Sequence, residues 1–124
     1  MMMNIKHKQK VLVIDEEGDL GELLEIGLKD DYVVDIIYDS KAALVKIPDF
    51  NPNLIITGKS IYQEASDIFA EIKKKHPIPI ILVLASKSQQ ALSVLQKKGV
   101  VSVMVKPFTL KELKSKIYSA LEKG

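Results

Sequence analysis

Pro-Asn-Leu-Ile-Ile-Thr-Gly, residues 52–58, is a short apolar run that leads into a loop and ends in a glycine. A run of this length between turn-forming residues is typical of a strand buried in a sheet. Two other apolar runs end in charged residues: Val-Leu-Val-Ile-Asp-Glu at 11–16 and Val-Met-Val-Lys-Pro-Phe at 103–108. If the three runs lie parallel in one sheet, an acidic pair, a glycine and a lysine meet at its carboxyl edge.

Five apolar runs alternate with five segments of helical pattern, which is typical of a parallel sheet covered on both faces. The run at 80–84 is apolar throughout and predicts a central strand, whereas Asp35 and Ser102 interrupt the second and fifth runs and predict edge strands. Right-handed crossovers then favour an α/β, flavodoxin-like, doubly wound five-stranded sheet in the order 2-1-3-4-5. The predicted strands are Val11–Ile14, Val33–Tyr38, Leu54–Thr57, Ile80–Leu84 and Val101–Val105.

The first two predicted helices are read from apolar spacing. The first has an inward stripe, and the second follows Asp39 and Ser40 and should end before Pro48, because proline clashes with the preceding turn. The residues expected to face inward are Leu20, Leu23, Leu24 and Leu28 in the first helix, and Ala43, Leu44 and Ile47 in the second.

The last three predicted helices carry boundary signals. The third runs from about Ala65 to Lys75, and the fourth lies between Ser86 and Gly99. The fifth opens with a capping box, Thr-Leu-Lys-Glu at 109–112. Its expected inward residues are Leu110, Leu113, Ile117 and Leu121.

Composition predicts a single domain over residues 10–124 behind a short tail at 1–9. The formal net charge is only +2, and all 18 basic residues are lysine, so the planar fork of arginine used in base and phosphate recognition is missing. Absence of cysteine excludes disulfides and thiolate metal sites, and no apolar run approaches the roughly 20 residues of a membrane span. We therefore expect no nucleic-acid or membrane partner, and a reducing, cytoplasmic location.

These motifs, in this order, resemble the receiver domain of the bacterial response-regulator family over about Lys10 to Leu121. The carriers are Val-Leu-Val-Ile-Asp-Glu-Glu at 11–17, Asn-Pro-Asn-Leu-Ile-Ile at 51–56, and Val-Met-Val-Lys-Pro-Phe at 103–108. The resemblance implies a domain that accepts a phosphoryl group from a histidine kinase on an aspartate at the end of strand three. An acidic pair would hold Mg²⁺, and a lysine after strand five would bind the acyl phosphate.

Carried over residue by residue, the resemblance makes Asp15 and Glu16 the acidic pair and Lys106 the lysine. Pro107 matches a proline whose preceding peptide bond is usually cis in the family. The positions that depart from the family are Gly58 for the phosphoacceptor, Leu84 for the phosphate-contacting hydroxyl, Val103 for the aromatic switch, and Ser60 for the metal-binding carbonyl.

The loss of the acceptor tolerates a shift in register, because no aspartate or glutamate lies between Asp49 and Glu64. We therefore expect a degenerate receiver that is not an enzyme. It should have no cofactor, because Asp15 and Glu16 alone would bind Mg²⁺ weakly. We also expect Lys106 to pair with one of these two carboxylates. The remnant pocket comprises Asp15, Glu16, Gly58, Leu84 and Lys106.

Three functions follow from this prediction. The preferred one is a phosphorylation-independent module that binds a protein partner or a second copy through the fourth helix, fifth strand and fifth helix, with an output domain possible in a longer chain. The alternatives are a conventional Mg²⁺-dependent phosphoacceptor and a small-ligand binder. The acidic loop at 15–19, without Gly-x-Gly-x-x-Gly, argues against the last. The polar residues expected on the interaction face are Lys87, Gln90, Lys97, Lys98, Lys111 and Lys114.

Overall fold

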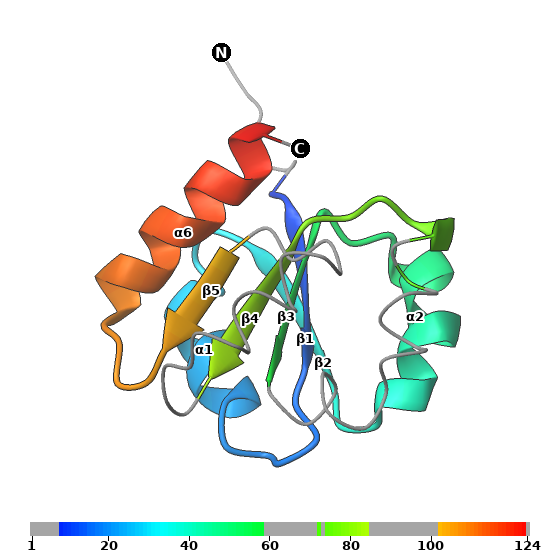
Figure 1. Cartoon of the computed structure of the whole chain (residues 1–124), viewed down its shortest axis with the longest axis horizontal. Coiled ribbons are helices and arrows are strands. Elements are labelled where there is room, and N and C mark those ends of the chain that lie inside the picture. Colours follow the sequence, from blue (N-terminus) through cyan, green and yellow to red (C-terminus); the bar gives the residue numbers. More distant parts are fainter. Residues whose placement is uncertain (1–7, 59–71, 73, 85–101, 124) are drawn as a thin grey trace.

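The computed structural model describes residues 8–58, 72, 74–84 and 102–123. Within them, five strands form one parallel sheet in the order β2-β1-β3-β4-β5 (Figure 1). This order and the two edge strands confirm the prediction. The strands are β1 (Lys10–Ile14), β2 (Val33–Ile37), β3 (Leu54–Gly58), β4 (Ile80–Leu84) and β5 (Ser102–Val105).

Helices lie on both sides of the sheet. α1 (Gly21–Leu28) and α6 (Leu110–Lys123) cover one face, and α2 (Ala43–Phe50), preceded by the 3₁₀ turn η1 (Ser40–Ala42), covers the other (Figure 1). These are three of the five predicted helices. The predicted fourth helix falls outside the described residues, as does the predicted third helix except for its last turn.

The sheet separates two apolar cores because side chains alternate along each strand. Val13, Ile56 and Val83 point to the face of α1 and α6, whereas Ile14, Ile55 and Leu82 point to the face of α2. β1, β3 and β4 are almost entirely buried, as expected for central strands of a doubly wound fold. The edge strand β2 carries Asp35, which pairs with Lys46 of α2 at 2.6 Å.

Two predicted inward residues lie at the surface instead. Leu23 is 65% exposed, because the buried stripe of α1 follows Leu20, Leu24 and Leu28 at a spacing of four, and Leu23 lies about 100° around the helix from Leu24. Leu110 is 42% exposed, because it is the first residue of α6, beyond the part of the helix that packs on the sheet.

The predicted end of the second helix before Pro48 is wrong. α2 continues to Phe50, and Asn51 closes it in the left-handed conformation (φ 56°), with its N–H donating to the Ile47 carbonyl at 2.7 Å. Pro48 lies in the last turn with its ring exposed, so the helix loses one backbone hydrogen bond without breaking.

Two local predictions around α6 are confirmed. The Thr109 N–H donates to Glu112 Oε1 at 2.9 Å and the Glu112 N–H donates to Thr109 Oγ1 at 3.0 Å, which is the reciprocal capping box. The peptide bond between Lys106 and Pro107 is cis. No helix in the described ranges is long and apolar enough to cross a membrane.

Candidate functional site

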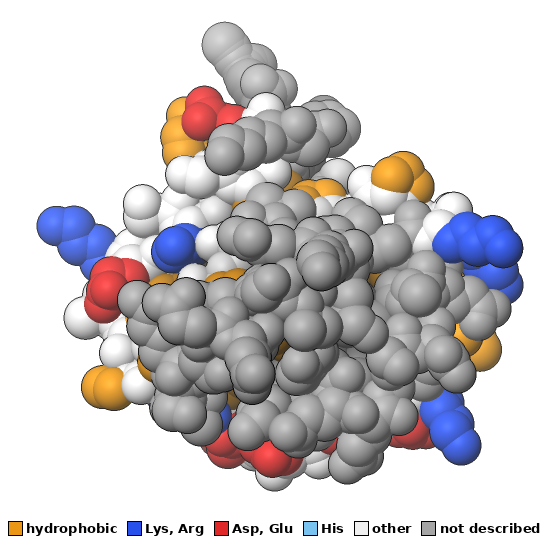
Figure 2. All heavy atoms as spheres, viewed as in Figure 1, with side chains coloured by type: hydrophobic (Ala, Val, Ile, Leu, Met, Phe, Trp, Pro, Cys, Tyr) orange, Lys and Arg blue, Asp and Glu red, His pale blue; other side chains and the backbone are white. Residues whose placement is uncertain are grey.

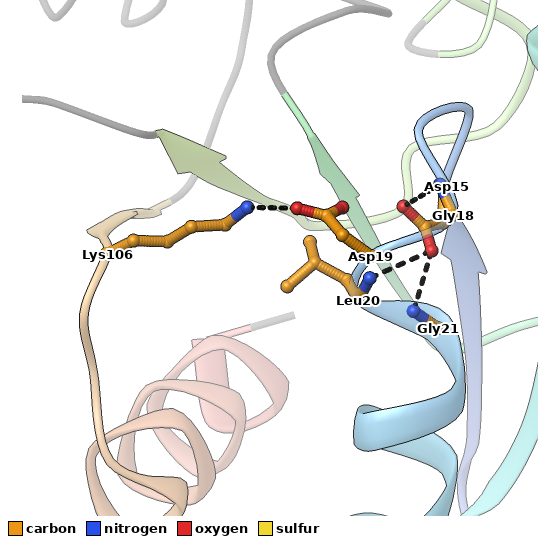
Figure 3. Close-up of polar contacts among 6 residues, drawn as sticks. All are labelled: Asp15, Gly18, Asp19, Leu20, Gly21 and Lys106. Carbon is orange, nitrogen blue, oxygen red and sulfur yellow. Dashed lines mark hydrogen bonds and ion pairs between the residues drawn. The ribbon is translucent and has the colours of Figure 1, made fainter.

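The Asp15 carboxylate lies at the carboxyl end of β1 and is 3% exposed. Its Oδ1 accepts from the Gly18 N–H at 3.1 Å, and its Oδ2 accepts from the N–H groups of Leu20 at 3.0 Å and Gly21 at 2.7 Å (Figure 3). The two last donors belong to the first turn of α1, whose positive end attracts a carboxylate. Asp15 therefore caps α1 from six residues upstream.

This capping role was missed from the sequence. A signal for it exists, because the residue at the N-cap position is Leu20, whose side chain cannot accept a hydrogen bond. The cap must then come from elsewhere, and Asp15 is the nearest buried acceptor. Both of its oxygens are used by the backbone in this arrangement.

Lys106 follows β5 and reaches across the carboxyl edge of the sheet to the loop after β1. Its Nζ lies 2.6 Å from Asp19 Oδ2 (Figure 3). The prediction that Lys106 pairs with Asp15 or Glu16 is wrong, because its partner is Asp19. Asp15 is turned inward to α1, while the β1–α1 loop, with Gly18 at a φ of 78°, brings Asp19 toward β5.

The ion pair shifts the titration of Asp19. The hydrogen bond from Lys106 lowers the pKa of the Asp19 carboxyl below its ordinary value, and burial opposes the shift. Both side chains are a third to a half exposed, so water screens the interaction. Lys106 nevertheless has a carboxylate partner at the sheet edge without any phosphoryl group.

Gly58 is the last residue of β3, beside Val83 of β4. A Cβ built on Gly58 meets no atom within 4 Å among the described residues, and its φ is not in the left-handed region. The backbone here therefore does not require glycine. With respect to the described residues, the position has room for a larger side chain.

Thr57 is the adjacent residue and points to the other side of the sheet. It pairs in register with Ile14 and Leu82 and is almost completely buried on the face of α2. Its hydroxyl has no hydrogen-bond partner within the described part of the chain. Its side chain therefore points to the opposite face of the sheet from the side chain position of Gly58.

The two predicted switch positions hold apolar side chains. Leu84 ends β4 and is buried, and Val103 of β5 packs against the same α2-side core. The Leu84 carbonyl accepts from the Lys106 N–H at 2.9 Å, which continues the strand pairing up to the lysine. Neither side chain offers a hydroxyl or an aromatic ring at this edge.

The remaining predicted site residues are placed as follows. Glu16 follows Asp15 and is partly buried. Acidic side chains gather at the lower edge of the molecule in Figure 2, where the β1–α1 loop runs in Figure 1.

Within the described ranges no group of three His, Cys, Asp or Glu is placed to hold a metal ion. Weak Mg²⁺ binding by Asp15 and Glu16 stays a prediction. Four residues of the predicted interaction face, with Ser60, lie outside the described residues: Lys87, Gln90, Lys97 and Lys98.

A shallow hollow of about 740 Å³ lies on the opposite side of the molecule from α1 and α6, between β2 and α2. Ile37, Val45 and Pro48 supply apolar lining, and Lys46 and Asp49 lie at it. Its lining residue Ile37 lies beside the acidic pair, because the Asp15 N–H donates to the Ile37 carbonyl at 2.8 Å. Asp15, Glu16 and Lys106 are not among the lining residues.

Solved structures share this architecture. NtrX from Brucella abortus in complex with ADP matches with a TM-score of 0.81 and 27% identity, over 92% of this chain and 26% of that one. A response regulator from Thermotoga maritima matches with a TM-score of 0.84 and 19% identity, over 93% and 98%. The signal receiver domain of a putative LuxO repressor protein from Vibrio parahaemolyticus gives 0.82 and 24%, over 94% and 92%.

The chain spans about a quarter of the length of the NtrX chain that it matches. The two shorter structures, at under 25% identity, show the fold. The family model for the response regulator receiver domain matches residues 11–118, which is most of the chain. Together with the 2-1-3-4-5 sheet, this match shows that the chain belongs to the response regulator receiver domain family of two-component signalling.

Proposed function

We propose that this receiver domain works without accepting a phosphoryl group on an aspartate, and that it signals as a non-enzymatic, cytoplasmic module through protein contacts. One observation carries the proposal. Gly58 ends β3 where the acceptor is expected, while Lys106, the expected phosphate ligand, is paired with Asp19 at 2.6 Å.

The chemistry of transfer supports this proposal. Phosphoryl transfer needs a nucleophile in line with the leaving group and cations on the equatorial oxygens. Gly58 offers no nucleophile, and the neighbouring Thr57 hydroxyl is buried on the other side of the sheet. The Asp15 carboxylate at the end of β1 is engaged by three backbone N–H groups.

The charge at the carboxyl edge is also balanced internally. In a site built for an acyl phosphate, the lysine would be available to the developing negative charge. Here Asp19 supplies that negative charge permanently, and its lowered pKa keeps it ionised throughout the physiological range. The domain can thus hold one arrangement of this edge without phosphate, which suits a constitutive contact module.

In this proposal, a partner protein or output domain that contacts the receiver carries the signal onward. The proposed surfaces are the fourth helix with β5 and α6, where Lys111 and Lys114 lie on α6. Lys114 already pairs with Asp31 at 2.9 Å. The NtrX chains are several times longer than the matched part, which supports the proposal that a receiver of this kind acts on an output domain.

Gly58→Asp gives a direct test, because no atom of the described part of the chain occupies the space that a side chain at position 58 would take. The protein would be incubated with acetyl phosphate and Mg²⁺ and measured by intact mass. We expect no phosphoryl adduct on the natural chain and a hydroxylamine-labile adduct on Gly58→Asp, with Gly58→Asn as the matched control without a nucleophile. A hydroxylamine-labile adduct on the natural chain would overturn the proposal.

A further inference from the structure

The edge strand β2 lies within a strongly strand-forming stretch of sequence. Residues 32–38 read Tyr-Val-Val-Asp-Ile-Ile-Tyr, with four β-branched residues and neither proline nor glycine. Asp35, at the centre, is the only charged residue of the seven. Short segments of this composition pair readily with strands of other chains when their backbone is accessible. Asp35 is therefore the one side chain in the stretch that opposes such pairing.

The backbone of β2 is open on one side, because among the described strands β2 pairs only with β1. The Val33 N–H donates to the carbonyl of the residue before β1 at 2.9 Å, and the Ile37 carbonyl accepts from the Asp15 N–H at 2.8 Å. Alternate residues of a parallel strand bond to the same neighbour. The backbone groups of Val34 and Ile36 therefore point away from β1. We call these outward groups the β2 edge.

The Asp35 carboxylate occupies one donor of the β2 edge. Its Oδ1 accepts from the Ile36 N–H at 2.9 Å, so this outward N–H already has a partner within the chain. A strand added beside β2 would have to displace the carboxylate before it could accept a bond from the same N–H. Of the two outward N–H groups of β2, the one nearer its carboxyl end is thus blocked.

Lys46 of α2 holds the Asp35 carboxylate beside the edge. Its Nζ lies 2.6 Å from Asp35 Oδ2, the oxygen that Ile36 does not use. The same ammonium lies 5.9 Å from the centre of the Phe50 ring, within the range of a cation–π contact. The Lys46 and Asp35 side chains are 33% and 36% exposed, so water still solvates the pair. A strand laid along β2 would cover this exposed part, and removing paired charges from water is costly.

We propose that Asp35, held by Lys46, closes the β2 edge and prevents the sheet of one chain from extending into the sheet of a second copy. Two effects act in the same direction, because the carboxylate occupies an outward donor and an added strand would desolvate the ion pair. This role is separate from signalling, and it does not depend on whether the domain accepts a phosphoryl group.

Asp35→Val is the direct test, because it removes both the acceptor and the charge and leaves an unbroken apolar strand. The full chain at about 100 µM, a concentration at which unpaired strand edges aggregate, would be followed by thioflavin T fluorescence and by loss of soluble protein on centrifugation. We expect the variant to form sedimentable, β-rich assemblies at least about tenfold faster than the natural chain. Urea unfolding of the fresh soluble protein establishes that the variant is folded before it assembles.

Asp31→Val is the matched control. Asp31 lies outside β2 and is also paired with a lysine, Lys114, at 2.9 Å, so this substitution makes the same change in charge and also breaks one ion pair. It should stay as soluble as the natural chain. If Asp35→Val does not fold, Asp35→Asn compared with Asp31→Asn decides the question, because the amide keeps the shape of the side chain and removes its charge. Assembly should again be faster for the variant at position 35.

Hydrogen exchange locates the contact. In the soluble natural chain the Ile36 N–H should exchange at least about tenfold more slowly than the Val34 N–H, because the Asp35 carboxylate occupies it. In the Asp35→Val assemblies both amides should be protected, because both then pair with a second copy.

Several results would overturn the proposal. One is an Asp35→Val chain that folds and stays soluble, and another is an Asp31→Val chain that assembles equally fast. Assemblies in which the amides of Val34 and Ile36 exchange freely would also overturn it, as would equal exchange of the two amides in the soluble natural chain. Acetyl phosphate plays no part in these measurements, so this proposal and the proposed function fail separately.

Discussion

The ammonium of Lys106 lies 2.6 Å from the Asp19 carboxylate and joins the end of β5 to the loop after β1 (Figure 3). In sheet order, β3 and β4 separate these two strands. The pair therefore spans the carboxyl edge where Gly58 ends β3 without a carboxylate. Lys106 therefore has its carboxylate partner in the loop after β1 and not at the end of β3.

Asp19→Asn should reduce the free energy of unfolding by about 0.2–1 kcal/mol at neutral pH and low salt, the range for half-exposed ion pairs. The pKa of Asp19 is lowered in the folded state, so its contribution is complete above the ordinary value of 3.8 and is lost as the pH falls through the folded value. Urea unfolding at pH 7 and at progressively lower pH checks this, because the difference from the natural chain should shrink as Asp19 becomes protonated.

The control for Asp19→Asn is Glu17→Gln, which changes the net charge equally at an exposed neighbouring position. A double-mutant cycle with Lys106→Met isolates the pair itself. Zero coupling between positions 19 and 106 at low salt, or a coupling that persists in strong acid, would contradict the assigned ion pair.

Asp15→Ala should lower the free energy of unfolding by about 2–4 kcal/mol, because three backbone N–H groups, two of them buried, lose a charged acceptor. Chemical denaturation measures the change, and Glu17→Ala provides an exposed carboxylate for comparison. Amide exchange should also quicken at Leu20 and Gly21. Equal effects of the two substitutions would show that Asp15 does not cap α1.

Gly21→Ala should destabilise the fold by about 1–3 kcal/mol, the usual range for overpacking. The added Cβ would lie 2.7 Å from Ile36 Cγ2 and 3.2 Å from Asp15 Oδ2, so the Ile36 side chain must shift and the Asp15 cap is crowded. Gly58→Ala is the matched control, because it has open space among the described residues and should change stability by less than about 0.5 kcal/mol. Thermal unfolding of the two variants should separate them clearly.

Thr109→Ala should cost about 1 kcal/mol by removing the acceptor for the Glu112 N–H at the start of α6. Glu112→Ala removes the reciprocal bond to the Thr109 N–H. Because the two bonds form one capping box, the double variant should lose less than the sum of the single losses in denaturant titrations. Simple additivity would argue against a reciprocal box.

Much of the fold was predictable because burial leaves a strong pattern in strands. The unbroken apolar run at Ile80–Leu84 predicted a central strand, and Asp35 predicted an edge strand. In the sheet, β4 is an inner strand and β2 is an edge strand, as predicted. The capping box before α6 was equally local, since Thr109 and Glu112 need only each other.

The errors arose where a side chain's partner depends on loop conformation or on helix rotation. Apolar spacing could not decide that Leu23 faces solvent, because spacings of three and four both occur on an amphipathic helix. The partner of Lys106 depended on how the chain turns at Gly18, which presents Asp19 while Asp15 is drawn to α1. No periodicity in the sequence describes that turn.

The bond between Lys106 and Asp19 also has a kinetic meaning, because 87 positions separate the two residues along the chain. Such a distant contact closes a large loop and forms only after β5 has joined the sheet. It should therefore be absent from the folding transition state, and Asp19→Asn should accelerate unfolding while leaving the refolding rate nearly unchanged. The ion pair would then form after the folding transition state and slow the unfolding of the sheet edge. Stopped-flow unfolding measures this rate.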